Sequence, residues 1–157
     1  DLVRSRGLGD VYKRQDKGIR LLVDESFVDF TYGYAANSLL HNVILAANPH
    51  MMVIKSYGKY EKDYAKACER IIAERETFHA ELQAIPYLCV IPSQANFFLC
   101  EVTKKYTSAE LVQKLIERNV MVSDCGLKSN MNGRNLVRLA IRSREDNGRL
   151  VGILRTL

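Results

Sequence analysis

The fold is decided around residues 51–59, which read Met51-Met52-Val53-Ile54-Lys55-Ser56-Tyr57-Gly58-Lys59. The first four residues are apolar and predict a short buried strand. Polar residues follow at once, and Lys59 stands where a lysine can form a Schiff base with a carbonyl compound. Ser56 can donate a hydrogen bond to a phosphate. Because ligands bind at the carboxyl ends of strands in open α/β sheets, the stretch indicates either such a site or a solvated surface lysine.

A second apolar stretch, residues 19–30, lies upstream, and Asp24 stands at the carboxyl end of the strand that it predicts. The separation of Asp24 from Lys59 is long enough for a parallel crossover connection. Two neighbouring parallel strands would then present a carboxylate and an amine at one edge of a sheet. Pyridoxal phosphate chemistry needs this pair, because the lysine holds the aldehyde and the carboxylate keeps the pyridine nitrogen protonated.

Four stretches, residues 23–30, 56–59, 92–98 and 137–147, resemble the motifs of fold-type I, class I/II aminotransferases in the family's order. The resemblance covers roughly residues 17–157. It is greatest to the branch that contains histidinol-phosphate aminotransferase and threonine-phosphate decarboxylase. The resemblance implies pyridoxal 5'-phosphate as cofactor. It also implies an α/β fold, in which a remnant of the large-domain sheet precedes a small C-terminal α+β domain whose sheet is covered by helices.

The chain divides into four parts by pattern and resemblance. Residues 1–16 show no sustained period and are expected to be an artefactual or disordered leader. Residues 17–59 are expected to be a partial large domain, residues 60–85 a long connecting helix, and residues 86–157 the small domain. In the family, a segment with glycines and an arginine separates the lysine from this helix, so we expect an internal deletion directly after Lys59.

Local patterns predict the elements that follow. Apolar residues at three- and four-residue steps predict a helix over residues 60–84. Thr107 and Glu110 have the spacing of a capping box, and Ser143 is expected to cap the last helix. Strands are expected at residues 88–91, 95–102, 120–122 and 136–141. The order from residue 86 is therefore β, β, α, β, β, α.

The resemblance assigns cofactor contacts to individual residues. It implies that Lys59 is the Schiff-base lysine, that Asp24 binds the pyridine nitrogen and that Ser56 binds the cofactor phosphate. The alternatives are a surface lysine, a helix-capping carboxylate and a turn serine. Gly58 replaces a serine often found before the lysine, which removes a phosphate contact. Phe27 replaces a tyrosine that hydrogen-bonds the phenolic oxygen of the cofactor, and phenylalanine cannot donate that bond.

Substrate contacts are implied for the C-terminal part. Arg138 matches the family arginine that receives the substrate's carboxylate or phosphate, a group that suits the planar guanidinium. Arg138, Ala140 and Arg142 share one face of their strand, and an arginine there can also be merely solvated. Asn96 and Phe97 are expected either to shape the substrate pocket or to support it structurally.

Composition narrows the class of protein. The 157 residues are 47% hydrophobic and carry a formal net charge of +5, which suits an anionic cofactor and substrate. The basic residues are scattered without interleaved aromatic residues, so no nucleic acid is expected. Without a run long enough to span a membrane or a recognisable signal peptide, a cytoplasmic location is expected. The four cysteines form no C-x-x-C pair, so neither a disulfide nor a metal site is expected.

We therefore expect an aminotransferase that moves an amino group between an amino acid, or a phosphorylated amine such as histidinol phosphate, and a 2-oxo acid. Threonine-phosphate decarboxylation uses the same apparatus and stays open, as does a basic α/β binding module without chemistry. The resemblance implies a homodimer whose subunits complete each other's sites. This chain is expected to be inactive, because the N-terminal half of an aminotransferase and the segment after the lysine are missing.

Overall fold

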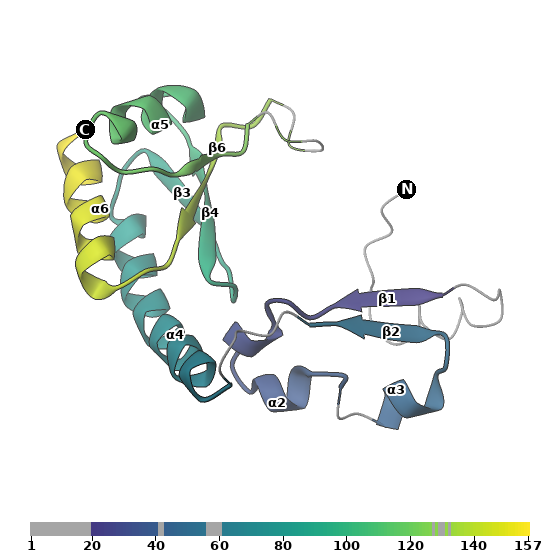
Figure 1. Ribbon diagram of the computed structural model, residues 1–157. Coiled ribbons are helices and arrows are strands. Elements are labelled where there is room, and N and C mark those ends of the chain that lie inside the picture. The colour runs from purple at the N-terminus through teal and green to yellow at the C-terminus, as the bar shows by residue number, and fades with distance from the viewer. Residues whose placement is uncertain (1–19, 41–42, 56–60, 127, 129–130, 132) are drawn as a thin grey trace.

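The computed structural model describes residues 20–40, 43–55, 61–126, 128, 131 and 133–157. It contains two lobes joined by the long helix α4, Glu61–Gln83 (Figure 1). The helix agrees with the expected residues 60–84 to within one residue at each end. The expected leader, residues 1–16, lies outside the described residues, and so does the expected deletion point after Lys59.

The first lobe is built on a parallel pair of strands, β1 (Leu21–Asp24) and β2 (Met51–Ile54). Their register places Asp24 opposite Ile54, so both strands end at the same edge. The parallel pairing expected from the sequence is therefore confirmed. The connection contains a turn of 3-10 helix, η1 (Val28–Phe30), and two short helices, α2 (Tyr34–Asn37) and α3 (Val43–Ala47).

The two faces of the strand pair differ. Side chains alternate between the faces of a strand, so Asp24 shares a face with Leu22, Met52 and Ile54. All four of these side chains are exposed. Figure 1 shows α2 and α3 on one side of the pair, whereas the exposed apolar face has no helix against it among the described residues.

The second lobe contains a four-stranded antiparallel sheet with the strand order β3-β4-β6-β5. Its strands are β3 (Leu88–Ile91), β4 (Phe97–Val102), β5 (Ser123–Asp124) and β6 (Leu136–Ala140). Together with helices α5 (Ser108–Ile116) and α6 (Arg144–Thr156) it gives the expected β, β, α, β, β, α order.

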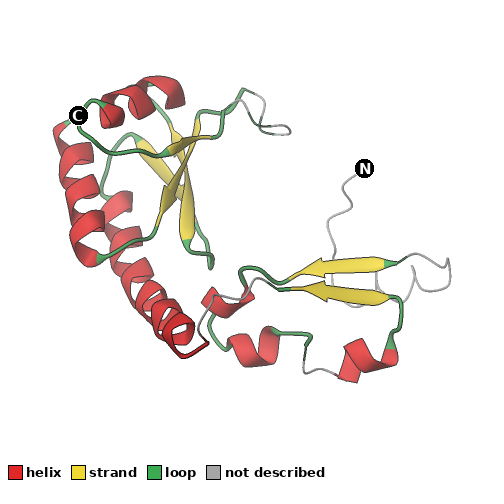
Figure 2. Ribbon diagram, viewed as in Figure 1, coloured by secondary structure: helices red, strands yellow, loops and turns green. Residues whose placement is uncertain are grey.

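Helices α4, α5 and α6 pack against one face of this sheet (Figure 2). The core between them is made of aliphatic and aromatic side chains, including Phe78, Leu82, Phe98, Leu111, Leu115, Leu139 and Leu154. Burying one side chain of this size stabilises a fold by about 1.5–3 kcal/mol. The α+β architecture with helices on one face is the one expected from the sequence.

Both predicted caps are formed. At α5, the Thr107 hydroxyl accepts from the Glu110 amide at 3.2 Å, and the Glu110 carboxylate accepts from the Thr107 amide at 2.8 Å. At α6, the Ser143 hydroxyl accepts from the Asp146 amide at 3.2 Å. These bonds satisfy amide donors that have no partner within the helix.

The strand expected at residues 120–122 is wrong, because β5 begins at Ser123. Asn119 adopts a left-handed conformation with φ 57° after α5. The Val120 amide donates to the Leu115 carbonyl at 2.9 Å, which closes the turn in the manner of a Schellman motif. Because of this turn, residues 120–122 do not pair with β6, and pairing begins at Ser123.

Candidate functional site

Asp24 lines a pocket of about 600 Å³ between the two lobes. The first lobe contributes Asp24 and Phe27 to its lining, and the loop before β4 contributes residues 93–95. The Asp24 carboxylate accepts hydrogen bonds from the amide and the hydroxyl of Ser26. These bonds lower the pKa of Asp24, so the group is ionised at neutral pH.

This pocket fits part of what pyridoxal phosphate needs. Its volume lies in the range of cofactor pockets, and an ionised carboxylate at a strand end is the partner that a protonated pyridine nitrogen requires. The other predicted contacts, Lys59 and Ser56, lie outside the described residues, as does Gly58.

Arg138 lies on β6, on the sheet face that the helices leave uncovered. Its Cζ atom is 4.5 Å from the centroid of the Phe97 ring. The Phe97 ring in turn contacts Phe27 edge-on, with the centroids 5.7 Å apart. The Nε atom of Arg138 is buried and has no hydrogen-bond partner among the described residues. A stack of Phe27, Phe97 and Arg138 therefore links the Asp24 lobe to the small-domain sheet.

Asn96 connects the start of β4 to the end of β6. Its backbone carbonyl accepts from the Ile141 amide at 2.9 Å. Its side-chain Oδ1 is buried and has no hydrogen-bond partner in the described part of the chain. The backbone of Asn96 is thus structural, and its side-chain acceptor is buried directly after the pocket residues 93–95. Arg142 is not at this pocket, because its guanidinium pairs with Asp146 elsewhere.

The end of β2 carries an ion pair that the sequence interpretation missed. The Lys55 Nζ atom lies 2.6 Å from the Asp29 Oδ1 atom, and the two side chains are only 13% and 7% exposed. Lys55 follows Ile54, so strand alternation directs it to the face opposite Asp24. Close by, Tyr64 has a raised pKa, because burial and the charge of neighbouring groups disfavour its ionised form.

Arg75 on α4 was also missed. It is 1% exposed, and its Nη1 atom donates to the carbonyls of Phe30 and Gln94, both at 2.7 Å. Its guanidinium also lies 5.1 Å from the centroid of the Tyr32 ring. One arginine thereby joins the connecting helix, the first lobe and the loop beside the pocket. The sequence could have revealed this burial, because Arg75 stands at helical spacing from Ile71 and Phe78 and therefore on the apolar face of the helix.

All four cysteines lie among the described residues, and none of them forms a disulfide bond. The described residues contain no cluster of His, Cys, Asp and Glu that could hold a metal ion. Among the described helices, none is long and apolar enough to cross a membrane.

Solved structures of similar fold contain both lobes. The histidinol-phosphate aminotransferase from Clostridium acetobutylicum aligns with a TM-score of 0.83 and 17% identity, over 95% of this chain and 57% of that chain. A decarboxylase from Sulfurospirillum multivorans aligns with a TM-score of 0.78 and 22% identity, over 95% of this chain and 55% of that chain. At 17% and 22% identity, these matches show a similar fold only.

Sequence relatives are more similar but are matched over shorter stretches. Histidinol-phosphate aminotransferase 2 of Archaeoglobus fulgidus is 36% identical over 94 residues, which are 60% of this chain and 26% of the relative. The L-serine phosphate decarboxylase of Campylobacter jejuni is 34% identical over 86 residues, 54% of this chain and 22% of the relative. The chain thus spans about a quarter of the length of the curated relatives that it matches.

The two-lobed fold, with an acidic strand end facing a small α+β domain, defines a transferase of the fold-type I, pyridoxal-phosphate-dependent class. Residues 59–154 match the family described as aminotransferase class I and II, and the chain belongs to this family. The predicted family, fold and cofactor class are thereby confirmed.

Proposed function

We propose that the chain is part of an enzyme that transfers an amino group between an amino acid or phosphorylated amine, such as histidinol phosphate, and a 2-oxo acid. The observation that carries the proposal is the Phe27–Phe97 contact. It joins the lobe that carries Asp24 to the sheet that carries Arg138, whose guanidinium lies over the Phe97 ring. An ionised carboxylate for the cofactor and a guanidinium for the substrate are the two charges that this chemistry requires.

The residues of this chain have distinct roles in the proposal. Pyridoxal phosphate, when bound, supplies an electron sink for the substrate's α-carbon. Asp24 holds the proton on the pyridine nitrogen, and Ser56 binds the phosphate. Lys59 carries the cofactor and moves the α-proton as a general base. Arg138 binds the carboxylate or phosphate of the substrate, and Asn96 orients the substrate through its side-chain acceptor.

The buried, unpartnered Nε of Arg138 supports its role. A guanidinium group carries five N–H donors, and a buried donor without a partner costs about 1–3 kcal/mol. The other N–H donors of the guanidinium, at its Nη atoms, can form a bidentate pair with a substrate anion. The Phe97 ring restricts the guanidinium to one plane, so less conformational entropy is lost when the anion binds.

A second candidate is decarboxylation of a phosphorylated amino acid such as threonine phosphate or serine phosphate. The 34% identity to the L-serine phosphate decarboxylase of Campylobacter jejuni favours it. Both reactions place an anionic group on an arginine and use the same electron sink. They differ in the bond that breaks at the α-carbon, which is the C–H bond in transamination and the bond to the carboxylate in decarboxylation.

The proposal includes an internal deletion and an inactive chain. An alignment over 185 residues with the uncharacterized protein y4rO of Sinorhizobium fredii, at 24% identity, is longer than the 157-residue chain itself. That alignment therefore contains positions at which this chain has no residue. We further propose a cytoplasmic homodimer for the complete enzyme, with sites completed by the partner subunit.

The test begins with the genomic DNA upstream of Lys17 and across the junction after Lys59. The open reading frame found there is expressed and assayed beside the 157-residue chain. We expect the longer protein to convert histidinol phosphate and 2-oxoglutarate, and the 157-residue chain to show no turnover. Release of carbon dioxide from threonine phosphate or serine phosphate, without amino transfer, would select the decarboxylase. Turnover by the 157-residue chain would contradict the deletion.

A further inference from the structure

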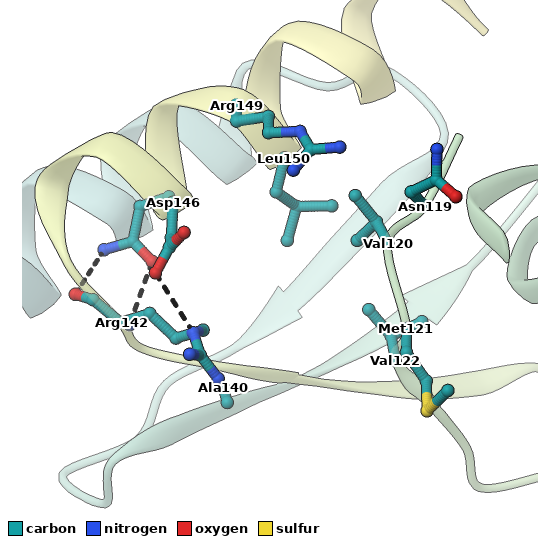
Figure 3. Close-up of a pocket in the computed structure, with 10 residues that line it drawn as sticks. Asn119, Val120, Met121, Val122, Ala140, Arg142, Asp146, Arg149 and Leu150 are labelled. Carbon is teal, nitrogen blue, oxygen red and sulfur yellow. Dashed lines mark hydrogen bonds and ion pairs between the residues drawn. The ribbon is translucent and has the colours of Figure 1, made fainter.

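A second pocket, of about 300 Å³, lies between residues 119–122 and the N-terminal half of α6 (Figure 3). It shares no residue with the pocket that contains Asp24. Its floor is apolar, with Val120, Val122 and Leu150, and two arginines, Arg142 and Arg149, lie at its margin. In Figure 3, Leu150 lies between these two arginines.

One side of this pocket is fixed by the end of α5. The left-handed residue Asn119 and the hydrogen bond from the Val120 amide to the Leu115 carbonyl set the path of the chain. An Nη2 donor of Arg149 reaches the Arg118 carbonyl at 3.2 Å, which ties α6 to the same turn. Arg149 is exposed, and this bond directs its side chain toward the turn that follows α5.

The other side is fixed by Asn147, which is buried. Its side-chain oxygen accepts from the Arg142 amide at 2.9 Å, and its side-chain nitrogen donates to the Arg142 carbonyl at 3.0 Å. The Arg142 Nε atom lies 3.2 Å from the Asp146 carboxylate. The backbone of Arg142 is thus fixed, and its 70% exposed side chain is directed toward Asp146.

The charges at the margin do not cancel. Hydrogen bonds from Arg142 and from Ser143 lower the pKa of Asp146, so this carboxylate is ionised at neutral pH. Two guanidinium groups and one carboxylate leave one positive charge over an apolar floor. Each guanidinium has five N–H donors and commits only part of them to the bonds described above.

We propose that this pocket binds a small monocarboxylate with a branched or planar apolar body. The carboxylate lies between Arg142 and Arg149, and the apolar body covers Val120 and Leu150. A single negative charge matches the single uncompensated positive charge. A bare inorganic anion matches the charge but leaves the apolar floor in water. An uncharged molecule of the same shape leaves the arginines without a counter-charge.

Met121 offers a reporter for this site. It is 88% exposed at the pocket, whereas Met51 is 8% exposed in the other lobe. The 157-residue chain, labelled at its methionine methyl groups, is titrated with isocaproate and followed by NMR. We expect a saturable shift of the Met121 methyl signal and no shift of the Met51 signal. Isocaproamide, which has the same shape without the charge, and inorganic phosphate are expected to give no saturable shift.

A charge-matched pair of variants tests the arginine. Arg149→Gln is expected to weaken isocaproate binding about tenfold or more, since it removes one of the two cations. Arg155→Gln removes the same charge from the same helix outside this pocket and is expected to bind as the unmodified chain does. The proposal is overturned if Arg149→Gln binds normally, if both variants lose binding equally, or if isocaproamide or phosphate binds as well as isocaproate. An equal shift at Met51 also overturns it.

Discussion

Arg138 lies with its guanidinium over the ring of Phe97, the Cζ atom 4.5 Å from the ring centroid. The sequence was compatible with two positions of Arg138, at the substrate site or in solvent. The contact with Phe97 shows on which face of the sheet its side chain lies. The strand β6 places the neighbours Val137 and Leu139 in the helix-covered core, so Arg138 must project from the other face. There it meets Phe97, and through Phe97 the lobe that carries Asp24.

The stack predicts the effect of Arg138→Lys in the restored enzyme. Lysine keeps the charge but loses the planar fork and the stacking on Phe97. We expect kcat/KM to fall by one to a few powers of ten, each power corresponding to about 1.4 kcal/mol of transition-state binding. Absorbance of the bound cofactor should persist, because the cofactor contacts lie in the other lobe. Unchanged kinetics would remove Arg138 from the site.

The assignment of Lys59 predicts where a reduced cofactor is attached. Borohydride treatment of the restored enzyme with pyridoxal phosphate, followed by peptide mapping, should find the label on Lys59. The informative competitor is Lys55, whose amine is 2.6 Å from Asp29 and lies on the opposite face from Asp24. A Lys55→Arg variant should therefore be labelled as the unmodified enzyme is. Label on Lys55 or on any other lysine would contradict the assignment.

Arg75 predicts a large loss of stability when its hydrogen bonds are removed. Arg75→Met keeps an unbranched side chain but leaves the carbonyls of Phe30 and Gln94 without this donor, at a cost of roughly 1–3 kcal/mol for the buried Phe30 carbonyl. Urea denaturation of the 157-residue chain, followed by circular dichroism, measures the change. Arg70→Met is the matched control, since Arg70 is an exposed arginine on the same helix. Equal free energies of unfolding for the two variants would mean that the hydrogen bonds of Arg75 make no net contribution to stability.

The two lobes predict different protection from hydrogen exchange. The small-domain sheet has four strands and a helix-covered core, whereas β1 and β2 form a two-stranded sheet with an exposed apolar face. Two-stranded sheets are marginally stable, and unpaired edges favour aggregation. Exchange measured on the 157-residue chain should therefore be slower for amides of β4 and β6 than for those of β1 and β2. Stronger protection before residue 56 than after residue 60 would reverse this order.

Sequence alone was sufficient wherever the deciding interaction is local. The capping box of Thr107 and Glu110 spans a single helical turn, and the apolar period of α4 is a property of one segment. The order of strands and helices was predicted for the same reason, since local pattern restricts it. The parallel pairing of β1 and β2 joins distant segments, and it was predicted from the length of the connection between them. The family motifs added the class of chemistry, which the matched family confirms.

Tertiary structure decided what depends on segments far apart in the chain. Arg75 is buried because its donors meet carbonyls 45 and 19 residues away, and Phe27 meets Phe97 only because the lobes pack together. Residues 120–122 are apolar and were expected to form a strand, but Val120 and Val122 instead pack against the core and line the second pocket. The physical reason is that burial and hydrogen-bond satisfaction are set by the whole packed arrangement, so a side chain's neighbours cannot be inferred from its sequence neighbours.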